Sequence, residues 1–337
     1  MVYDNLFTAD GWPNWKAIVD IGCTINLILG GRGTGKTFSC LDYELEHDRR
    51  FCFMRKNQVQ LDMVMAPENS PFIPLNLEKG YDVELKKRGK ISRIFNGNKD
   101  VGFMVALAAV SGLRGFDASL IQDIIYDEFI HERHEKPMRG EFEALLNAYE
   151  TMNRNRELQG REPIKLYLLA NSNSLDSDIL LGFKLVEIIR KMRRKGRTVY
   201  IDKKRSILIV DLFSSPISQK KKETALYKAV EGSDFYGMAI KNEFSYDRTD
   251  KVKAMPLNEY ILEIRVGEIN IYKHKSRKEY YVSSTQKGTP KEIINPVGEG
   301  RKRLLRKYMK YYKYHVDNKV LFENMTSKIL FEKYYLG

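Results

Sequence analysis

The sequence has few cysteines, no long apolar run and no internal repeat. Its 3 cysteines, Cys23, Cys40 and Cys52, lie inside apolar segments and lack metal-ligand spacing. We therefore expect reduced core residues in a cytosol-like compartment, without a disulfide framework or a cysteine metal site. No apolar run approaches the ~20 residues that a membrane-spanning helix needs. The first residues also lack the basic and then apolar layout of a secretory signal peptide.

The composition is that of an ordinary globular protein except for its charge. The 337 residues, 43% hydrophobic and 30% charged, predict two domains with a sizeable core. The net charge is +13, which indicates a polyanionic partner such as nucleic acid, although a generic basic protein remains the alternative. Basic runs occupy residues 190–197, 220–222 and 301–307.

A glycine-rich loop follows an apolar segment near the start of the chain. Residues 24–29 predict a buried strand, residues 37–45 predict a helix, and the pattern between them is G-x-x-x-x-G-K-T. This is the phosphate-binding loop of nucleotide-binding proteins, because glycines let backbone N–H groups turn toward an anion. We expect Lys36 to reach the β- and γ-phosphates of ATP, and the Thr37 hydroxyl to hold Mg²⁺. The residues predicted to bind the nucleotide are Gly30, Gly31, Arg32, Gly33, Thr34, Gly35, Lys36 and Thr37.

Two adjacent carboxylates end a second apolar segment, residues 120–129. This is a Walker B pattern. We expect Asp127 to hold the Mg²⁺ shell and Glu128 to polarise the attacking water, since adjacent residues at a strand end point in different directions. The alternative is a solvated strand end, which the upstream phosphate loop disfavours.

A third apolar strand, residues 164–170, ends at Asn171. A polar side chain at such a strand tip can contact the γ-phosphate or the attacking water, so Asn171 is a candidate sensor. An ordinary turn explains it equally well, because Asn and Ser are common in turns.

The chain divides into three parts by composition. We expect a nucleotide-binding domain at 1–196, a basic linker at 197–231 and an α+β domain at 232–337. The last part predicts three antiparallel strands (260–266, 268–272 and 279–283) and two helices (299–316 and 325–335).

With these motifs in place, the chain resembles the DNA-packaging ATPases, terminase-like motors, of the small protein-primed tailed phages (the phi-29 group). The residues that carry the resemblance are GRGTGKT (31–37), IIYDEFI (124–130), ALLN (144–147), NRNRE (153–157) and LANS (169–172). It covers roughly residues 20 to 175. The resemblance implies a P-loop NTPase of the additional-strand, catalytic-glutamate type, with a mostly parallel central sheet and flanking helices. It also implies a smaller C-terminal α+β domain that is a vestigial RNase H-like nuclease.

The same resemblance implies a function. Proteins of this group form a ring, commonly of five subunits, at the portal of a viral prohead in the host cytoplasm. They use ATP and Mg²⁺ to push double-stranded DNA into the shell, and whether a structural RNA takes part is left open. Arg154 matches a trans-acting arginine of the group, with Arg156 as a close alternative. Arg114 falls at the position of a second trans-acting basic residue, which is Lys in the group.

Two other functions deserve comparison. A large terminase would cut DNA as well as package it, but Glu259, Glu263 and Glu268 do not form a dependable acid cluster for a two-metal nuclease. A nucleotide-dependent AAA-like remodelling switch without nucleic acid is disfavoured by the basic runs.

Basic residues after two strands of the nucleotide domain are candidates for DNA contact. Arg55 and Lys56 follow the strand at 50–55, and Arg133 and Lys136 follow the acid pair. We expect them to bind the phosphate backbone, because a motor that moves any sequence needs contacts indifferent to sequence. The alternative is that they are solvated loop residues.

Overall fold

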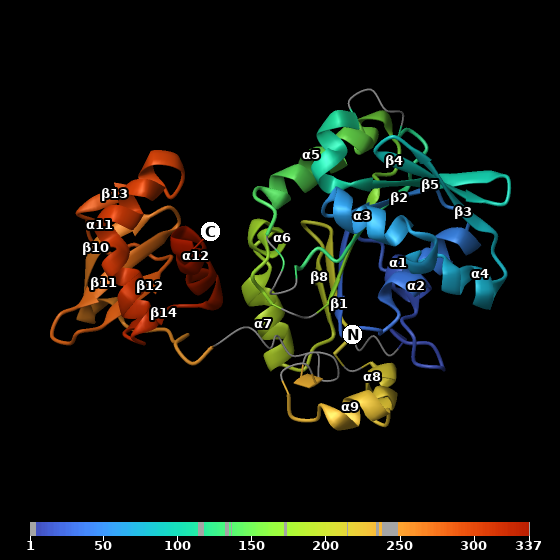
Figure 1. Ribbon diagram of the computed structural model, residues 1–337. Coiled ribbons are helices and arrows are strands. Elements are labelled where there is room, and N and C mark those ends of the chain that lie inside the picture. The colour runs from blue at the N-terminus through green and yellow to red at the C-terminus, as the bar shows by residue number, and fades with distance from the viewer. Residues whose placement is uncertain are drawn as a thin grey trace. The chain divides into compact units, whose positions relative to one another are not determined.

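The computed structural model describes residues 5–113, 118–131, 135, 137–171, 174–213, 215–233, 236–237 and 249–336. The chain divides into two compact units (Figure 1). The first comprises Met1–Phe183 and Lys191–Tyr246, and the second comprises Lys184–Arg190 and Asp247–Gly337. No helix among the described residues combines the length and the apolar character needed to cross a membrane.

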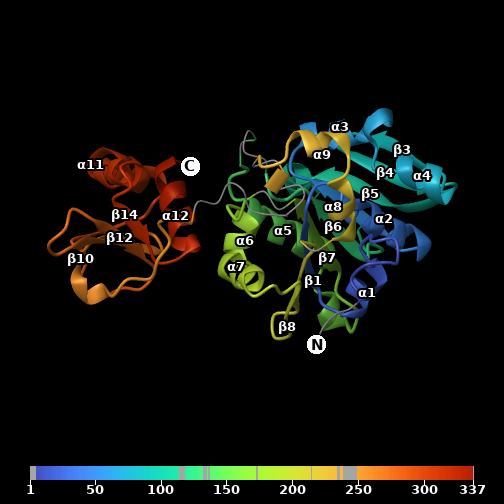
Figure 2. The same ribbon diagram turned by 90° about the horizontal axis from the view of Figure 1, so that it is seen from below.

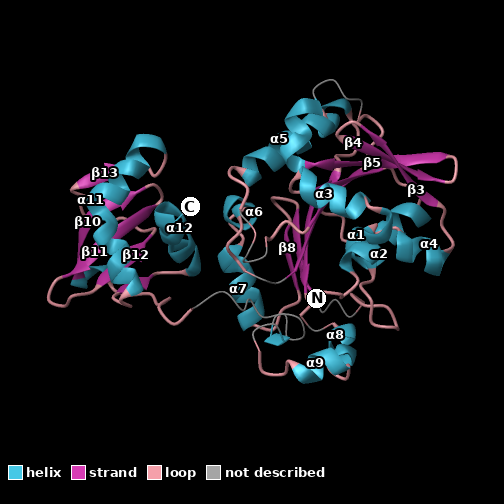
Figure 3. Ribbon diagram, viewed as in Figure 1, coloured by secondary structure: helices cyan, strands magenta, loops and turns pink. Residues whose placement is uncertain are grey.

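The first unit is built on a nine-stranded sheet with the order β3-β4-β5-β2-β6-β7-β1-β9-β8. Figure 3 shows strands in magenta and helices in cyan. The strands are β1 Ile25–Gly30, β2 Phe51–Arg55, β3 Val83–Arg88, β4 Ile91–Asn96, β5 Lys99–Ala106, β6 Asp123–Asp127, β7 Lys165–Asn171, β8 Val199–Asp202 and β9 Ile207–Asp211. Strands β5, β2, β6, β7, β1 and β9 run parallel, and β3, β4 and β8 pair in antiparallel fashion at the two edges. The predicted mostly parallel central sheet is confirmed.

The helices of this part of the chain connect and cover the strands. They are α1 Trp15–Asp20, α2 Lys36–Glu46, α3 Gln58–Met65, α4 Ile73–Lys79, α5 Glu141–Asn153, α6 Asp178–Gly182, α7 Val186–Arg194, α8 Pro216–Lys221 and α9 Ala225–Ala229. Every residue of β2, β6 and β9 is buried. Strands of this kind read as continuous apolar runs because helices cover both faces of a parallel sheet.

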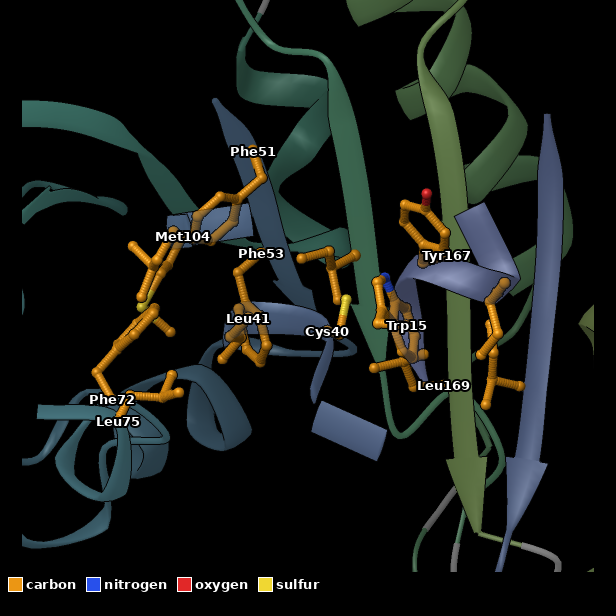
Figure 4. Close-up of a cluster of buried hydrophobic side chains, with 14 of the residues drawn as sticks. Trp15, Cys40, Leu41, Phe51, Phe53, Phe72, Leu75, Met104, Tyr167 and Leu169 are labelled. Carbon is orange, nitrogen blue, oxygen red and sulfur yellow. The ribbon is translucent and has the colours of Figure 1, made fainter. Parts of the chain in front are cut away.

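One face of the sheet packs against helices from the first part of the chain (Figure 4). Phe51 and Phe53 of β2 and Tyr167 of β7 meet Trp15 of α1 and Leu41 of α2 in one buried cluster. The three cysteines are buried and free, as predicted. This packing fixes α2, and therefore the phosphate loop before it, on the sheet.

The structure contradicts the predicted linker at 197–231. Strand β9 lies beside β1 in parallel, with Ile25 opposite Ile207, and β8 pairs with β9 at the sheet edge. The apolar run that forms β9 is buried because it completes the sheet next to the strand that carries the phosphate loop. Helices α8 and α9 follow β9 within the same stretch.

The second unit has a five-stranded sheet with the order β13-β10-β11-β12-β14. Its elements are β10 Tyr260–Val266, β11 Ile269–His274, β12 Tyr280–Ser283, β13 Glu292–Ile294, α11 Gly298–Val316, β14 Val320–Phe322 and α12 Met325–Leu336. The predicted antiparallel meander and both helices are confirmed. The prediction missed β13, which adds to β10 in parallel, and β14, which adds to β12 in parallel. Each has only three residues.

Candidate active site

The candidate site lies where three neighbouring strands end. Strands β6, β7 and β1 are neighbours in the sheet (Figure 2). They run parallel, so Asp127, Asn171 and Gly30, which end them, come to one edge of the sheet. Ligands of open α/β sheets bind at this carboxyl edge. A pocket with about 550 Å³ of empty space opens there, lined by residues 32–38, Asp127, Glu128, Ala170 and Asn171.

The phosphate loop has the backbone that its glycines predict. Gly35, the N-cap residue of α2, has φ +82°, and a β-carbon there would come within 2.6 Å of the Trp12 ring. The left-handed conformation and the close ring together require glycine. Because α2 begins at Lys36, its N-terminal N–H groups point toward the pocket, where they favour an anion.

Lys36 is buried in this pocket among neutral acceptors. Its Nζ donates to the carbonyl oxygens of Gly30 (3.1 Å) and Gly31 (2.9 Å) and to Asn171 Oδ1 (3.1 Å). Burial lowers the pKa of Lys36 to about 8, while the nearby carboxylates of Asp127 and Glu128 oppose the shift. Within the described residues the ammonium hydrogen-bonds to neutral oxygens and forms no ion pair, so a phosphate group fits it. The contact with Lys36 also brings Asn171 into the site.

Thr37 and Asp127 adjoin each other as a magnesium site requires. The Thr37 hydroxyl donates to Asp127 Oδ2 at 3.1 Å, and Asp127 is buried. Burial raises the pKa of Asp127, and the guanidinium of Arg55 opposes this. Hydroxyl and carboxylate oxygens suit Mg²⁺, which takes few protein ligands and completes its shell with water and substrate phosphates. No group of three or more His, Cys, Asp or Glu residues in the described ranges could hold a metal ion.

Glu128 has a strained backbone at the mouth of the pocket. Its φ is +57°, a conformation uncommon outside glycine, and its N–H donates to Asp127 Oδ1 at 3.1 Å. Its side chain is 49% exposed, whereas Asp127 points inward. Strained residues of this kind cluster at functional sites, where the surrounding structure holds them.

Arg55 ties the two acids together. Its Nη2 lies 3.2 Å from Asp127 Oδ2, and its Nη1 donates to Glu128 Oε2. The prediction that Arg55 and Lys56 contact DNA is therefore wrong, because they are only 8% and 2% exposed. Lys56 Nζ lies 3.6 Å from Glu141 Oε2. The reason is the strand order: β2 lies beside β6, so the residue that ends β2 meets the acids that end β6.

The predicted arginines differ in their surroundings. Arg154 is exposed at the end of α5 with φ +48°, and its Nε donates to the Thr151 carbonyl at 3.4 Å. Arg156 is buried, and its Nη2 donates to the carbonyls of Ser119 (2.9 Å) and Ala118 (3.3 Å). Arg156 therefore secures the chain that leads into β6, while the Arg154 side chain is exposed to solvent.

Three predicted site residues, Arg114, Arg133 and Lys136, lie outside the described residues. Two residues of the site were missed by the sequence analysis. Arg55 was assigned to DNA rather than to the acids. Lys221 of α8 was noted only as part of a basic run, yet its Nζ donates to the Arg32 carbonyl in the phosphate loop. No local pattern marks either one, because both reach the site through the order of strands in the sheet.

Comparison of the sequence with known protein families assigns the chain to one of them. The sequence model of the podovirus DNA encapsidation proteins (Gp16) matches residues 12–321. The chain belongs to this family. The resemblance recognised from the motifs is therefore confirmed.

A relative and two solved structures agree with this membership. A DNA packaging protein of Bacillus phage B103 is 25% identical over 228 residues, which cover 66% of this chain and 65% of that protein, slightly less than two thirds of its length. The phi-28 gp11 DNA packaging motor has a TM-score of 0.66 at 18% identity and covers 97% of both chains. The bacteriophage phi-29 viral genome packaging motor assembly has a TM-score of 0.67 at 17% identity, covering 96% of this chain and 98% of that one. At these identities the structures share the fold.

Proposed function

We propose that the protein is an ATPase that moves double-stranded DNA, and that it packages a viral genome into a preformed prohead as one subunit of a ring motor. The observation that carries the proposal is the convergence of a buried lysine, a Thr37–Asp127 pair and a strained Glu128 on one pocket. Family membership, and the printed names of the packaging proteins that share the sequence or the fold, support the DNA-packaging part.

Each side chain of the pocket has a role in this proposal. Lys36 binds the β- and γ-phosphates, and Asn171, its hydrogen-bond partner, reports the γ-phosphate or the water. Thr37 and Asp127 would hold Mg²⁺, which when bound neutralises phosphate charge. Glu128 orients and polarises the attacking water, and Arg55 positions both acids.

The ring supplies what one subunit lacks. Arg154 is exposed and is not among the residues that line the pocket of its own chain. We propose that it stabilises the phosphoryl transition state in the neighbouring subunit, and that Arg114 assists it. A pentamer at the portal, and contact of the DNA with Arg133 and Lys136, remain parts of the proposal.

The second unit is proposed to be a vestigial nuclease-like domain that binds nucleic acid or the prohead without cutting. A two-metal nuclease needs converging carboxylates whose charge is available to metal ions. The carboxylates of the described sheet, Glu263 and Glu292, are instead paired with lysine or arginine side chains. The net charge of +13 supports a polyanionic partner for the whole chain.

The test is ATP hydrolysis by the full chain assembled with proheads, measured with and without double-stranded DNA. We expect hydrolysis that DNA stimulates, and we expect Lys36→Ala to abolish it because the phosphates lose their ammonium partner. Lys16→Ala is the matched control, since Lys16 is an exposed lysine of α1 that pairs with Asp20. Hydrolysis indifferent to DNA, or equal activity of Lys36→Ala, would overturn the proposal, and Mn²⁺-dependent nicking of DNA would indicate a terminase instead.

A further inference from the structure

Helix α8 follows a residue that packs on the start of the phosphate loop. The chain leaves β9 with Leu212, whose N–H donates to the Leu29 carbonyl at 2.8 Å. The Leu212 Cβ lies 3.0 Å from the place where Gly30 would carry a β-carbon. The segment that leads into α8 therefore packs directly on the residue that begins the loop.

The N-terminal segment holds α8 from another side. Pro216 packs so closely on Gly11 that a β-carbon there would come within 2.8 Å of it. Lys220 Nζ donates to the Asp10 carbonyl at 3.2 Å. With contacts at its start and near its end, α8 places its last residue, Lys221, over the phosphate loop.

Lys221 ends on the loop itself. Its Nζ donates to the Arg32 carbonyl and lies 3.1 Å from the β-carbon position of Gly33. The acceptor is neutral, and the Tyr227 ring, whose centroid lies 4.9 Å from Nζ, offers the ammonium a cation–π contact but no formal negative charge. Lys221 also adds to the positive potential at Lys36, where it is one of the causes that lower the pKa. Two lysine ammonium groups thus face one phosphate loop.

We propose that Lys221 binds a phosphate oxygen of the nucleotide, as a second lysine ligand supplied by the same chain. The ligand class is a nucleoside diphosphate or triphosphate, so this inference rests on the proposed function. An anion in the loop exchanges a neutral acceptor for a charged one and removes the repulsion between the two ammonium groups. The flexible four-carbon stem of lysine lets Nζ change acceptor while α8 stays in place.

The test is equilibrium titration of the full chain with fluorescent ADP and ATP analogues. We expect Lys221→Met to weaken binding about tenfold to a hundredfold, the range for losing one hydrogen bond to a charged group. Lys221→Arg should retain most of the affinity, because its guanidinium still donates to phosphate. Lys228→Met is the matched control, since Lys228 lies on α9 and pairs with Glu223 at 3.2 Å. Loss for ATP alone would support the proposal and assign the contact to the γ-phosphate.

Nucleotide titration and thermal unfolding of the variants separate the possible failures. If wild-type protein and every variant bind neither nucleotide, the proposed function fails together with the inference. If wild-type protein binds, Lys36→Ala does not, and Lys221→Met binds like wild type, only the inference is overturned. Thermal unfolding without nucleotide tests whether Lys221→Met is folded, and Lys221→Gln replaces it if it is not. Equal loss in Lys221→Met and Lys228→Met would also contradict a specific contact.

Discussion

Each unit holds a pair of carboxylates on its sheet, and the two pairs have opposite surroundings. Asp127 and Glu128 share one guanidinium, that of Arg55, and border an open pocket. In the second unit, Glu263 of β10 and Glu292 of β13 lie on paired strands. Glu263 accepts from Lys291 Nζ (2.9 Å) and Tyr311 OH (2.7 Å), and Glu292 from Lys307 Nζ (2.7 Å) and Tyr308 OH (2.8 Å).

The pKa directions follow this difference. Burial raises the pKa of Asp127. Burial would also raise that of Glu263, but hydrogen bonds from Lys291 and Tyr311 bring it below its ordinary value. Hydrogen bonds from Lys307 and Tyr308 likewise lower the pKa of Glu292. A carboxylate whose charge is already balanced has little to gain from a divalent cation, whereas two acids that share one arginine retain negative charge for one. The same residue types thus border an open pocket in one sheet and form structural ion pairs in the other.

The largest expected effect concerns whether the first site needs an arginine from another subunit. The ion pairs of the second unit, in contrast, form within one chain. Arg154→Ala should reduce turnover of the assembled ring by about 10³–10⁵-fold, the value of a trans-acting arginine in other nucleotide hydrolases. Nucleotide affinity should stay unchanged, because Arg154 does not line the pocket of its own chain. ATP hydrolysis and nucleotide titration of the same preparation check both expectations.

Mixing experiments sharpen this prediction. An Arg154→Ala subunit keeps an intact pocket, and a Lys36→Ala subunit keeps its arginine, so mixed rings should regain part of the activity. Arg156→Ala is the informative comparison, because it should lower the unfolding temperature through its lost bonds to Ala118 and Ser119. If mixtures remain inactive although both variants assemble, Arg154 acts on the nucleotide of its own subunit.

The next effect compares the two acid pairs directly. Glu128→Gln should bind ATP but hydrolyse it about 10²–10⁴-fold more slowly, since an amide polarises water poorly. Glu263→Gln should leave hydrolysis unchanged and destabilise the second unit by about 1 kcal/mol, because the buried Tyr311 hydroxyl loses a charged acceptor. Hydrolysis rates and thermal unfolding curves of both variants measure this contrast. If the wild-type protein nicks DNA in a metal-dependent way and Glu263→Gln abolishes this activity, Glu263 is more than a structural ion-pair partner. The proposed difference between the two acid pairs would then be contradicted.

The sequence predicted the parts of the site that are local in the chain. A strand, a glycine loop and a helix are consecutive, so their spacing alone indicates how Lys36 and Thr37 meet a phosphate. The acids at 127 and 128 end an apolar strand, and the alternating residues of the second unit predicted its meander. These inferences need only periodicity and the chemistry of short motifs.

The parts that failed depend on which strands are neighbours. Arg55 meets the acids only because β2 lies beside β6, and the assumed linker enters the sheet only because β9 pairs with β1. Lys221 reaches the loop because β9 delivers α8 there. Strand order in a parallel sheet is set by long crossover connections, and no short pattern in the residues records it.

The smallest expected effect is a proton taken up when nucleotide binds. Burial lowers the pKa of Lys36 to about 8, so about half of these side chains carry the proton at pH 8. A phosphate beside the ammonium raises that pKa, and binding at pH 8 should therefore take up about half a proton per site, while at pH 6.5 Lys36 is already charged. The pKa of Lys36 in the folded chain lies below its value in the unfolded chain. This group therefore makes the nucleotide-free protein more stable as pH rises from about 8 towards 10.5.

Calorimetric titration of ADP in two buffers of different ionisation enthalpy measures the proton uptake. The Lys36→Arg variant, whose guanidinium stays protonated, should abolish this uptake. If wild-type protein takes up no proton at pH 8, Lys36 is already fully charged before the phosphate binds. The electrostatic difference between the pocket and the ion-paired acids of the second unit would then not hold.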